Sequence, residues 1–339
     1  MSPALHPTLR IGIVGLGRLG KRHAENLAWR VPGAALVAAA TPIAGEQAWA
    51  RQTFPGIATY GDLPALLGHD GLDVVWLVTP TTLHADQTIA VLEAGKHVFC
   101  EKPLALKPED CDRVITVARN HPEQCAMVGF MRRFDPAYAE AKRQLQSGEL
   151  GKLFHIGCSS LDPVDPAGFF VRFAPTSGGI FLDCCIHDID LVRWMLDGAR
   201  AIGITATGTR TMYPALAACG DIDNGFATVT FEGGVVATFH VSRTSHKGYE
   251  ATMRLDGTRG TLSIGHNQAR LPLIAERGGQ TIVDGLPDFF ARFNDAFLLE
   301  ARAFVAAIRE RHPSPLSLDD AREATRLACA IRDSLVQPA

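Results

Sequence analysis

Two residues capable of acid–base chemistry, Asp183 and His187, stand four positions apart in the sequence. If the chain between them is helical, their side chains lie on one face of the helix. An unperturbed imidazole has a pKa of about 6.5, so a histidine can accept a proton near neutral pH, and a carboxylate beside it can orient the ring. Structural roles also fit these residues: Asp183 as a helix N-cap and His187 as a hydrogen-bonded core histidine.

A third candidate, Lys102, follows the apolar run at residues 97–100 and precedes Pro103. Ligands of open α/β sheets bind at the carboxyl ends of the strands, so a lysine there could hold a hydroxyl group. Its charge would stabilise negative charge that develops on the hydroxyl oxygen. An ordinary surface lysine in a loop is the alternative interpretation of the same residue.

A glycine-rich segment at residues 15–20 has the pattern GxGxxG and stands between an apolar run and a helical run. Gly15 allows the tight turn, Gly17 lets the backbone approach a pyrophosphate, and Gly20 lets the helix pack closely on the strand. The first N–H groups of the helix would then face the phosphates. In this strand–loop–helix context the pattern predicts a dinucleotide site rather than a turn without a ligand.

The segment that should distinguish NAD from NADP carries no charge. NAD-binding units usually have an acidic residue at the end of the second strand, where it holds the ribose hydroxyls. This strand ends with alanines followed by Thr41 and Pro42. Thr41 can make a hydrogen bond but cannot repel a 2′-phosphate, and residues 41–47 contain no arginine that would attract one. These residues therefore leave the choice between NAD and NADP open, and we expect NAD with NADP as the alternative.

The first third of the chain alternates short apolar runs with helical runs, which predicts parallel strands joined by helical crossovers. We expect strands at residues 9–14, 35–40, 74–78, 97–100 and 125–129. We expect helices at residues 19–31, 45–53, 63–67, 83–94 and 108–120. Residues 1–130 are therefore predicted to form a dinucleotide-binding α/β domain of the Rossmann type.

The pattern changes after about residue 130, where strand-like runs are separated by turn signals instead of helices. We expect strands at residues 153–160, 225–231, 235–242, 251–255 and 261–264, and helices at 137–147, 181–196, 288–310 and 318–335. Residues 131–339 are therefore predicted to form an α+β domain with a large, mostly antiparallel open sheet, which binds substrate and mediates oligomerisation. A C-terminal helix that packs back on the first domain is compatible with this division.

Composition excludes several other classes of protein. The 339 residues carry a formal charge of −3, and the most basic run, at residues 21–23, is too short to bind nucleic acid. No apolar run approaches the roughly 20 residues that cross a bilayer, and residues 1–10 lack the apolar core of a signal peptide. We therefore expect a cytoplasmic protein with no membrane partner. The eight cysteines show no metal-ligand spacing, so we expect free thiols and no metal.

Several motifs together resemble the superfamily of glucose–fructose oxidoreductase, inositol dehydrogenase and rhizopine-catabolism proteins (GFO/IDH/MocA). They are the glycine loop ending at His23, the segment TPTTLH at residues 79–84, Glu101-Lys102-Pro103, Gly178-Gly179 leading to Asp183 and His187, and DGTRG at residues 256–260. They follow the family's order through most of the chain. The segment GFMRRFDP at residues 129–136 and the Asp183/His187 pair are most similar to the inositol 2-dehydrogenase branch.

The resemblance implies oxidation of a secondary hydroxyl group of a cyclic polyol or sugar, most of all inositol, with hydride transfer to NAD or NADP. It assigns catalysis to Lys102, Asp183 and His187, with His187 as general base. It implies a cofactor site formed by the following residues: Gly15, Leu16, Gly17, Arg18, Leu19, Gly20, Thr41, Pro42, Thr79, Pro80, His84, Glu101, Lys102 and Arg132. Thr41 departs from the family, because the inositol enzymes usually carry an acidic residue there.

A polyol needs several polar contacts in addition to the catalytic residues. Arg132 is expected, by the resemblance, where cofactor and substrate meet, and Lys102 is expected to touch the substrate too. Asp162, Asp165 and Arg172 lie in an apparently irregular stretch before Asp183 and could supply further contacts. Turn-forming aspartates and a surface arginine are the alternative interpretation.

Two alternatives remain open from the sequence. An aldose 1-dehydrogenase of the same superfamily would carry the same catalytic trio. A regulator that binds the cofactor without turnover would keep the glycine loop, although the intact trio argues against it. The open sheet predicts a homo-oligomer, a dimer or a tetramer, because the resembled family often assembles through that face.

Overall fold

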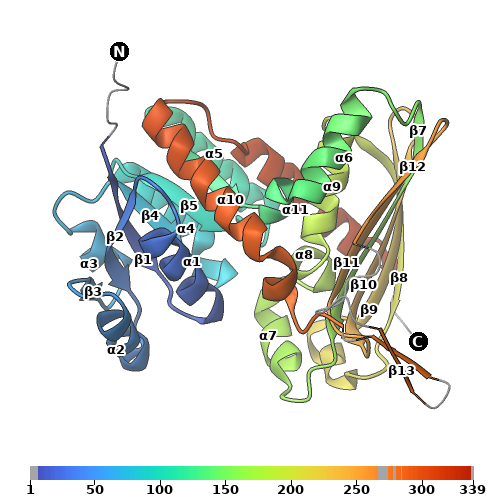
Figure 1. The fold of residues 1–339 in the computed structure, drawn as a ribbon, viewed down its shortest axis with the longest axis horizontal. Coiled ribbons are helices and arrows are strands. Elements are labelled where there is room, and N and C mark those ends of the chain that lie inside the picture. The colour runs from blue at the N-terminus through green and yellow to red at the C-terminus, as the bar shows by residue number, and fades with distance from the viewer. Residues whose placement is uncertain (1–6, 266–273, 278–279, 284, 337–339) are drawn as a thin grey trace. The chain divides into compact units, whose positions relative to one another are not determined.

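The computed structural model describes residues 7–265, 274–277, 280–283 and 285–336. The chain forms two compact units (Figure 1). The first contains Met1–Met131 and Asp295–Glu323, and the second contains Arg132–Asn294 and Ala324–Ala339. Among the described residues, none of the helices combines the length and the apolar character needed to cross a membrane.

The first unit is built on a six-stranded parallel sheet with strand order β3-β2-β1-β4-β5-β6. The strands are β1 Leu9–Val14, β2 Ala34–Ala40, β3 Ala58–Tyr60, β4 Val74–Leu77, β5 His97–Glu101 and β6 Ala126–Gly129. This is the doubly wound order of a dinucleotide-binding fold. Strands β1, β4 and β5 are almost entirely buried, as expected where helices cover both faces of a sheet.

The helices that connect these strands are α1 Arg18–Trp29, α2 Ala44–Thr53, α3 Leu63–Leu67, α4 Thr81–Glu93 and α5 Pro108–Asn120. An aromatic cluster fills part of the core: the rings of Trp76 and Phe99 stack with centroids 3.8 Å apart. Phe304, from the part of α10 (Phe289–Glu310) that belongs to this unit, packs edge-on against both rings. The predicted α/β alternation is confirmed, and β3 is the one strand of this sheet that the sequence analysis did not predict.

The second unit contains a seven-stranded mixed sheet with order β12-β11-β7-β10-β9-β8-β15. The strands are β7 Leu153–Pro163, β8 Ala201–Thr209, β9 Asn224–Phe231, β10 Val236–Ser245, β11 Glu250–Gly257, β12 Thr261–Ile264 and β15 Leu335–Val336. Two neighbouring pairs, β7 with β10 and β8 with β15, are parallel, and the other pairs are antiparallel. The prediction of a mostly antiparallel open sheet is confirmed. Strands β13 Ile274–Arg277 and β14 Gln280–Val283 form a separate hairpin.

The helical segments of this unit are η1 Met131–Phe134, α6 Pro136–Gln146, α7 Phe169–Ser177, α8 Ile180–Asp183, α9 Ile186–Met195 and η2 Pro214–Cys219. On one face of the sheet, α8 contacts β10 and α9 contacts β7. The helices α10 and α11 (Leu318–Asp333) contribute residues to both units, and α10 is kinked at Phe293.

Three expectations for the second half were wrong. The helix predicted over residues 181–196 is two helices, because the chain leaves the regular helical pattern at Cys184 and Cys185. The stretch expected to be irregular contains α7, which includes Pro175. The last predicted helix ends at Asp333, and Leu335 begins a short strand instead.

Candidate active site

The glycine loop joins β1 to α1 in the first unit. Gly15 has φ +90°, a conformation that residues with a Cβ rarely adopt, and its N–H donates to Ala40 O at 2.9 Å. A Cβ on Gly15 would collide with the backbone carbonyl of Val78, and one on Gly20 would collide with the carbonyl of Gly15. A Cβ on Gly17 would meet no atom within 4 Å. Packing therefore requires glycine at positions 15 and 20, whereas Gly17 leaves open space beside the backbone.

This loop fits a dinucleotide. Helix α1 begins at Arg18 with Gly17 as its N-cap, and no side chain caps its free N–H groups. The first turn has no acidic residue that would repel a phosphate. Free N–H groups and the positive end of the helix dipole favour an anionic pyrophosphate at this position.

His84, which is buried in α4, contacts both of the segments that follow β4 and β5. Its Nδ1 lies 2.7 Å from Pro103 O and its Nε2 lies 2.8 Å from Thr79 O. Burial lowers the pKa of His84, and a neutral imidazole has one N–H, so it donates to one of these carbonyls at a time. His84 thus contributes by holding the loops of Thr79 and Pro103 rather than by an exposed side chain.

Lys102 follows a buried carboxylate at the end of β5. Glu101 is 4% exposed; its Oε1 lies 2.8 Å from His23 Nε2, and its Oε2 accepts the backbone N–H of Lys102 at 3.1 Å. The Glu101 carboxylate therefore fixes the backbone from which the Lys102 side chain extends.

Asp183 and His187 lie in the second unit, on two short helices. Asp183 is the last residue of α8, and His187 is the second residue of α9 and is buried. Before α8 the chain turns through Gly178 and Gly179, at φ +80° and +91°, where a Cβ would be strained. The prediction that Asp183 and His187 lie on a single helix is therefore wrong. The turn at Cys184 and Cys185 sets their positions.

Arg243, which was not predicted from the sequence, contacts Asp183. Arg243 lies on β10 and is fully buried; its Nη2 donates to Asp183 Oδ2 at 3.2 Å and its Nη1 donates to Asp221 Oδ2 at 2.8 Å. Burial opposes its charge, but the acidic groups around it raise the pKa of Arg243 overall. The strand period could have revealed it, because Arg243 has the same phase as the core residues Phe239 and Val241.

Arg132 lies in the core of the second unit and is 2% exposed. Its Nη1 donates to Asp188 Oδ1 at 2.6 Å and to Ser160 Oγ at 2.9 Å, and its Nη2 donates to Tyr249 OH at 3.1 Å. Because Asp188 follows His187 in α9, Arg132 anchors the helix that carries the histidine. The described contacts of Arg132 are thus those of a buried positioning residue.

The three further candidates for substrate contacts differ in their surroundings. Asp165 accepts the backbone N–H groups of Ala167 and Phe170 at the start of α7, and Arg172 donates to Ala167 O. These contacts fit the local structural roles left open by the sequence. Asp162, at the end of β7, accepts from Cys184 Sγ at 3.3 Å, so it lies beside the turn that follows Asp183.

The first unit has a doubly wound sheet with a glycine loop of the nucleotide-binding type. The second unit has a mixed sheet and carries an Asp and a His on adjoining helices. Together these features define a two-domain nicotinamide-dependent oxidoreductase. Residues 9–130 match the family described as "Oxidoreductase family, NAD-binding Rossmann fold", and residues 138–263 match the "GFO/IDH/MocA C-terminal domain". The chain belongs to the GFO/IDH/MocA oxidoreductase family, as its motifs indicated.

Relatives that act on inositols are similar to this chain over most of its length. The scyllo-inositol 2-dehydrogenase (NAD(+)) of Bacillus subtilis (strain 168) is 37% identical over 302 residues, 89% of this chain and 86% of the relative. The myo-inositol 2-dehydrogenase of Thermotoga maritima is 30% identical over 328 residues, 96% of each chain. The crystal structure of scyllo-inositol dehydrogenase from Lactobacillus casei with NAD(H) and scyllo-inositol has a TM-score of 0.91 at 34% identity and covers 97% of each chain.

Proposed function

We propose that this protein oxidises a secondary hydroxyl group of an inositol and transfers the hydride to NAD. The observation that carries the proposal is the likeness, over 97% of both chains, to a structure bound to NAD(H) and scyllo-inositol. The glycine loop supports it, because Gly15 and Gly20 are fixed by packing while the space beside Gly17 is open. The two relatives described above, from Bacillus subtilis and Thermotoga maritima, are inositol dehydrogenases as well.

The proposed chemistry divides the reaction between the cofactor and the side chains. Bound NAD accepts the hydride, and the protein must manage the hydroxyl proton. A hydroxyl group resembles water, with a pKa of about 15.7, whereas an unperturbed imidazole has a pKa of about 6.5. At about 1.36 kcal/mol per unit, forming a free alkoxide first would cost roughly 12 kcal/mol. Removal of the proton must therefore accompany departure of the hydrogen from carbon.

In this proposal His187 accepts the hydroxyl proton and Lys102 stabilises the negative charge that develops on the oxygen. Asp183 orients the substrate or the imidazole. Its carboxylate is half-buried and held by Arg243, which supports a fixed orientation rather than a mobile surface group. Asp162 is the best placed of the further substrate candidates, because it lies beside Cys184.

A substrate panel tests the proposal. Initial rates of NADH formation are measured with myo-inositol, scyllo-inositol and representative aldoses, each with NAD and with NADP. We expect kcat/KM for at least one inositol to exceed that for every aldose by about tenfold or more. Faster turnover of an aldose would assign the chain to the aldose dehydrogenases. NADH binding without turnover of any polyol or sugar would indicate a regulator instead.

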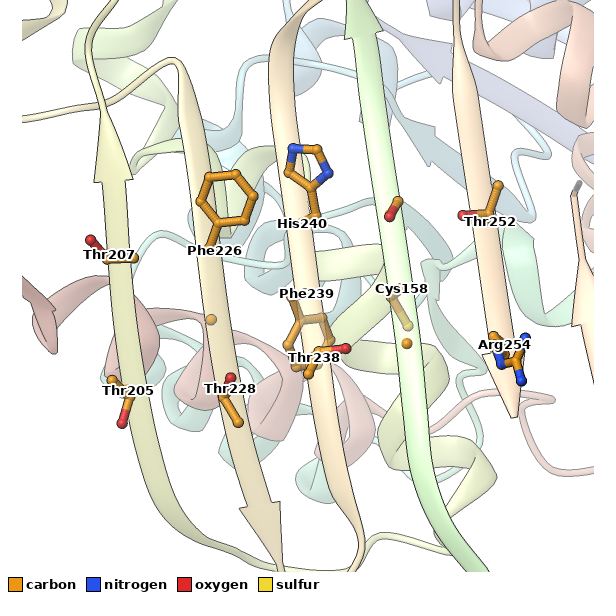
Figure 2. A pocket seen from close by; sticks show the side chains of 13 residues that line it. Cys158, Thr205, Thr207, Phe226, Thr228, Thr238, Phe239, His240, Thr252 and Arg254 are labelled. Carbon is orange, nitrogen blue, oxygen red and sulfur yellow. The ribbon is translucent and has the colours of Figure 1, made fainter. Parts of the chain in front are cut away.

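We further propose that the open face of the seven-stranded sheet joins copies of the chain into a homo-oligomer. A pocket lies on the sheet, and Figure 2 shows side chains that line it, among them Thr205, Phe226, Thr238, His240 and Arg254. The Phe226 side chain is large, apolar and 43% exposed, and its ring stacks on that of His240 with centroids 4.6 Å apart. Aromatic side chains are enriched in protein interfaces, so the exposed Phe226 supports the proposal that another chain covers this face.

Light scattering after size exclusion tests this second proposal. Phe226→Glu should reduce the oligomer to smaller species, because it places a charge in the interface. Trp29→Glu, a change at a residue of the first unit that is 62% exposed, serves as the control. An unchanged mass for Phe226→Glu would exclude this face as the interface.

A further inference from the structure

The end of β2 carries a carboxylate that the sequence order does not reveal. Thr41, directly after β2, stands where NAD-binding units usually have an acidic residue. Five residues later, in the first turn of α2, Glu46 turns back toward it. Thr41 Oγ1 donates to Glu46 Oε2 at 2.5 Å. A negative charge is therefore present at this strand end, although it comes from a helix.

The position of this pair relative to the glycine loop is fixed by the backbone. The N–H of Gly15 donates to the carbonyl of Ala40 at 2.9 Å, and Thr41 is the next residue along the chain. The loop that fits the pyrophosphate and the Thr41–Glu46 pair thus lie at neighbouring strand ends of the same unit. In dinucleotide folds, this is the side on which the adenosine ribose lies.

The surroundings hold the pair in place. Gln47 donates from Nε2 to Thr41 O at 2.8 Å and to Tyr60 O at 3.3 Å, so the strand end is bound to the start of α2 and to β3. Thr41 is 3% exposed, and Glu46 is half-buried. The Thr41 hydroxyl engages one carboxylate oxygen of Glu46, and a carboxylate has further acceptor sites for a ligand hydroxyl.

Two basic side chains of α1 and α2 have contacts of other kinds. Arg51, later in α2, donates to Thr59 Oγ1 at 2.6 Å, and Lys21 Nζ lies 5.0 Å from the ring centroid of Trp49. NADP-binding units need a cation to accept the 2′-phosphate. The charged group that contacts Thr41 is instead an anion.

We propose that Glu46 replaces the missing acidic residue of β2: its carboxylate, held by Thr41, binds the adenosine ribose hydroxyls of NAD and repels the 2′-phosphate of NADP. The inference rests on the proposed use of a nicotinamide cofactor, and it adds the residue that selects NAD. A phosphate ester carries about −1.5 to −2 at pH 7, so a carboxylate at this position opposes it strongly. The repulsion should weaken as salt screens both charges.

The test is a comparison of cofactor affinities without any substrate. Dissociation constants of NADH and NADPH are measured by fluorescence titration of the full chain, for wild type, Glu46→Gln and Glu109→Gln. Glu46→Gln keeps the size and the acceptor for Thr41 but removes the charge. Glu109 is also a first-turn glutamate, in α5, so its variant controls for the loss of a favourable helix-dipole contact.

We expect wild type to bind NADH at least about 100-fold more tightly than NADPH. Glu46→Gln should weaken NADH binding several-fold and strengthen NADPH binding about tenfold or more, and the gain should shrink at high salt. Glu109→Gln should leave both constants within about twofold. If wild type binds both cofactors equally, or if Glu46→Gln changes both constants by the same factor, the inference is wrong and Glu46 has a structural role.

The outcome is separate from that of the proposed reaction. Because the titration contains no polyol, a chain that prefers NADH through Glu46 but turns over no inositol would retain this inference and lose the proposed substrate. A chain that oxidises inositol equally well with both cofactors would retain the substrate and lose the role of Glu46.

Discussion

At the scale of single residues, Glu101 is surrounded by groups that share its buried site. It contacts His23 Nε2 on one side and the backbone of Lys102 on the other. Glu300, from α10, is fully buried, and neither of its carboxylate oxygens has a hydrogen-bond partner among the described residues. Burial, with a smaller contribution from the charge of Glu101, raises the pKa of Glu300 well above its usual range. Burial therefore favours the protonated form of Glu300 in the folded chain.

This protonation predicts how stability depends on pH. Above about pH 4.5 an unfolded chain releases the Glu300 proton, whereas the folded chain keeps it. The contribution of Glu300 to the free energy of unfolding is therefore fully present below that pH. It is lost as pH rises toward the folded-state pKa of Glu300, at up to about 1.4 kcal/mol per pH unit. Glu300→Gln should unfold at a higher temperature than wild type at pH 8, with a smaller difference at pH 5.

The measurement is thermal unfolding by circular dichroism across that pH range. Glu310→Gln, a change at a glutamate of the same helix whose side chain is 54% exposed, should show no such dependence. A constant difference between Glu300→Gln and wild type at every pH would contradict the assignment of a proton to Glu300.

The proposed catalytic roles of Lys102 and His187 are tested by removing each functional group. Lys102→Met and His187→Ala should each lower kcat by about 10² or more, since each loses acid–base or oxyanion assistance. Lys107→Met, a change at the exposed N-cap of α5, is the control. Stopped-flow measurement of the hydride step should show the loss while NADH binding is retained. Near-normal turnover of either variant would remove that residue from the mechanism.

Positions in the fold were predictable from the sequence where a local pattern carries them. The glycine loop and Lys102 were each predicted to follow a strand, and the structure confirms these positions, while the role of Lys102 stays a prediction. Glu46 and Arg243 were missed because their partners, Thr41 and Asp183, come close only when the chain folds. No spacing rule reports a contact between residues that are 60 positions apart.

At the scale of elements, α8 is held at both ends. Asp221 Oδ1 accepts the N–H of Ile180, the first residue of this four-residue helix, at 2.9 Å. Asp221 Oδ2 accepts from Arg243, which reaches Asp183 at the other end of the helix. A helix this short is not stable alone, so these contacts determine its position. Arg243 therefore positions Asp183.

Substitution of Arg243 tests that role. Arg243→Met removes the cation that contacts the buried carboxylate of Asp221 and the half-buried carboxylate of Asp183. Losing one partner of a buried pair costs about 3–5 kcal/mol. Arg243→Lys keeps the charge but cannot donate to both carboxylates in the same geometry. For Arg243→Lys we expect kcat to fall about tenfold with little change in KM. For Arg243→Met we expect a larger loss of kcat together with a lower melting temperature.

Arg133→Lys is the matched control, since Arg133 pairs with Asp190 in the same unit through two contacts of 2.6 and 2.8 Å. It should reduce stability without lowering kcat. An Arg243→Lys enzyme that loses stability but keeps the wild-type kcat would show that Arg243 serves the fold alone.

Elements were predictable where apolar period and turn residues agree. Strand β1 and helices α3 and α5 match their predicted bounds. The break between α8 and α9 was not predictable, because Cys184 and Cys185 carry no helix-breaking signal. Strand β8, with the sequence AIGITATGT, has few large apolar residues and pairs with β9 nonetheless. Its pairing in the sheet outweighs its weak local preference.

At the scale of the whole molecule, the residues proposed for catalysis belong to two units that each have their own sheet. Lys102 belongs to the first unit, and Asp183 and His187 belong to the second. The chain passes between the units within α10 and within α11, so neither unit is a single continuous segment. Cofactor binding can therefore be tested through its effect on the unfolding of the complete chain.

A ligand that binds only the folded state stabilises it by RT ln(1 + [L]/Kd), about 2.7 kcal/mol at 100 times Kd. Substitutions of two glycines in the loop, Gly17 and Gly20, should differ in their effects on the melting temperature with and without NADH. A Cβ on Gly17 meets no protein atom within 4 Å, so Gly17→Ala should keep the wild-type melting temperature without ligand. The same Cβ occupies space that the pyrophosphate needs. A tenfold loss of affinity would reduce the NADH effect to about 1.4 kcal/mol.

Gly20→Ala should behave in the opposite way, because its Cβ would collide with the backbone carbonyl of Gly15. Its melting temperature should fall before any NADH is added, since the strand and the helix must separate to admit the methyl group. Gly45→Ala, in α2, also meets no atom within 4 Å and serves as the control for both variants. If Gly17→Ala retains the full NADH effect, the open space beside Gly17 is not where the dinucleotide binds. If it melts early without NADH, that space is needed by the fold itself.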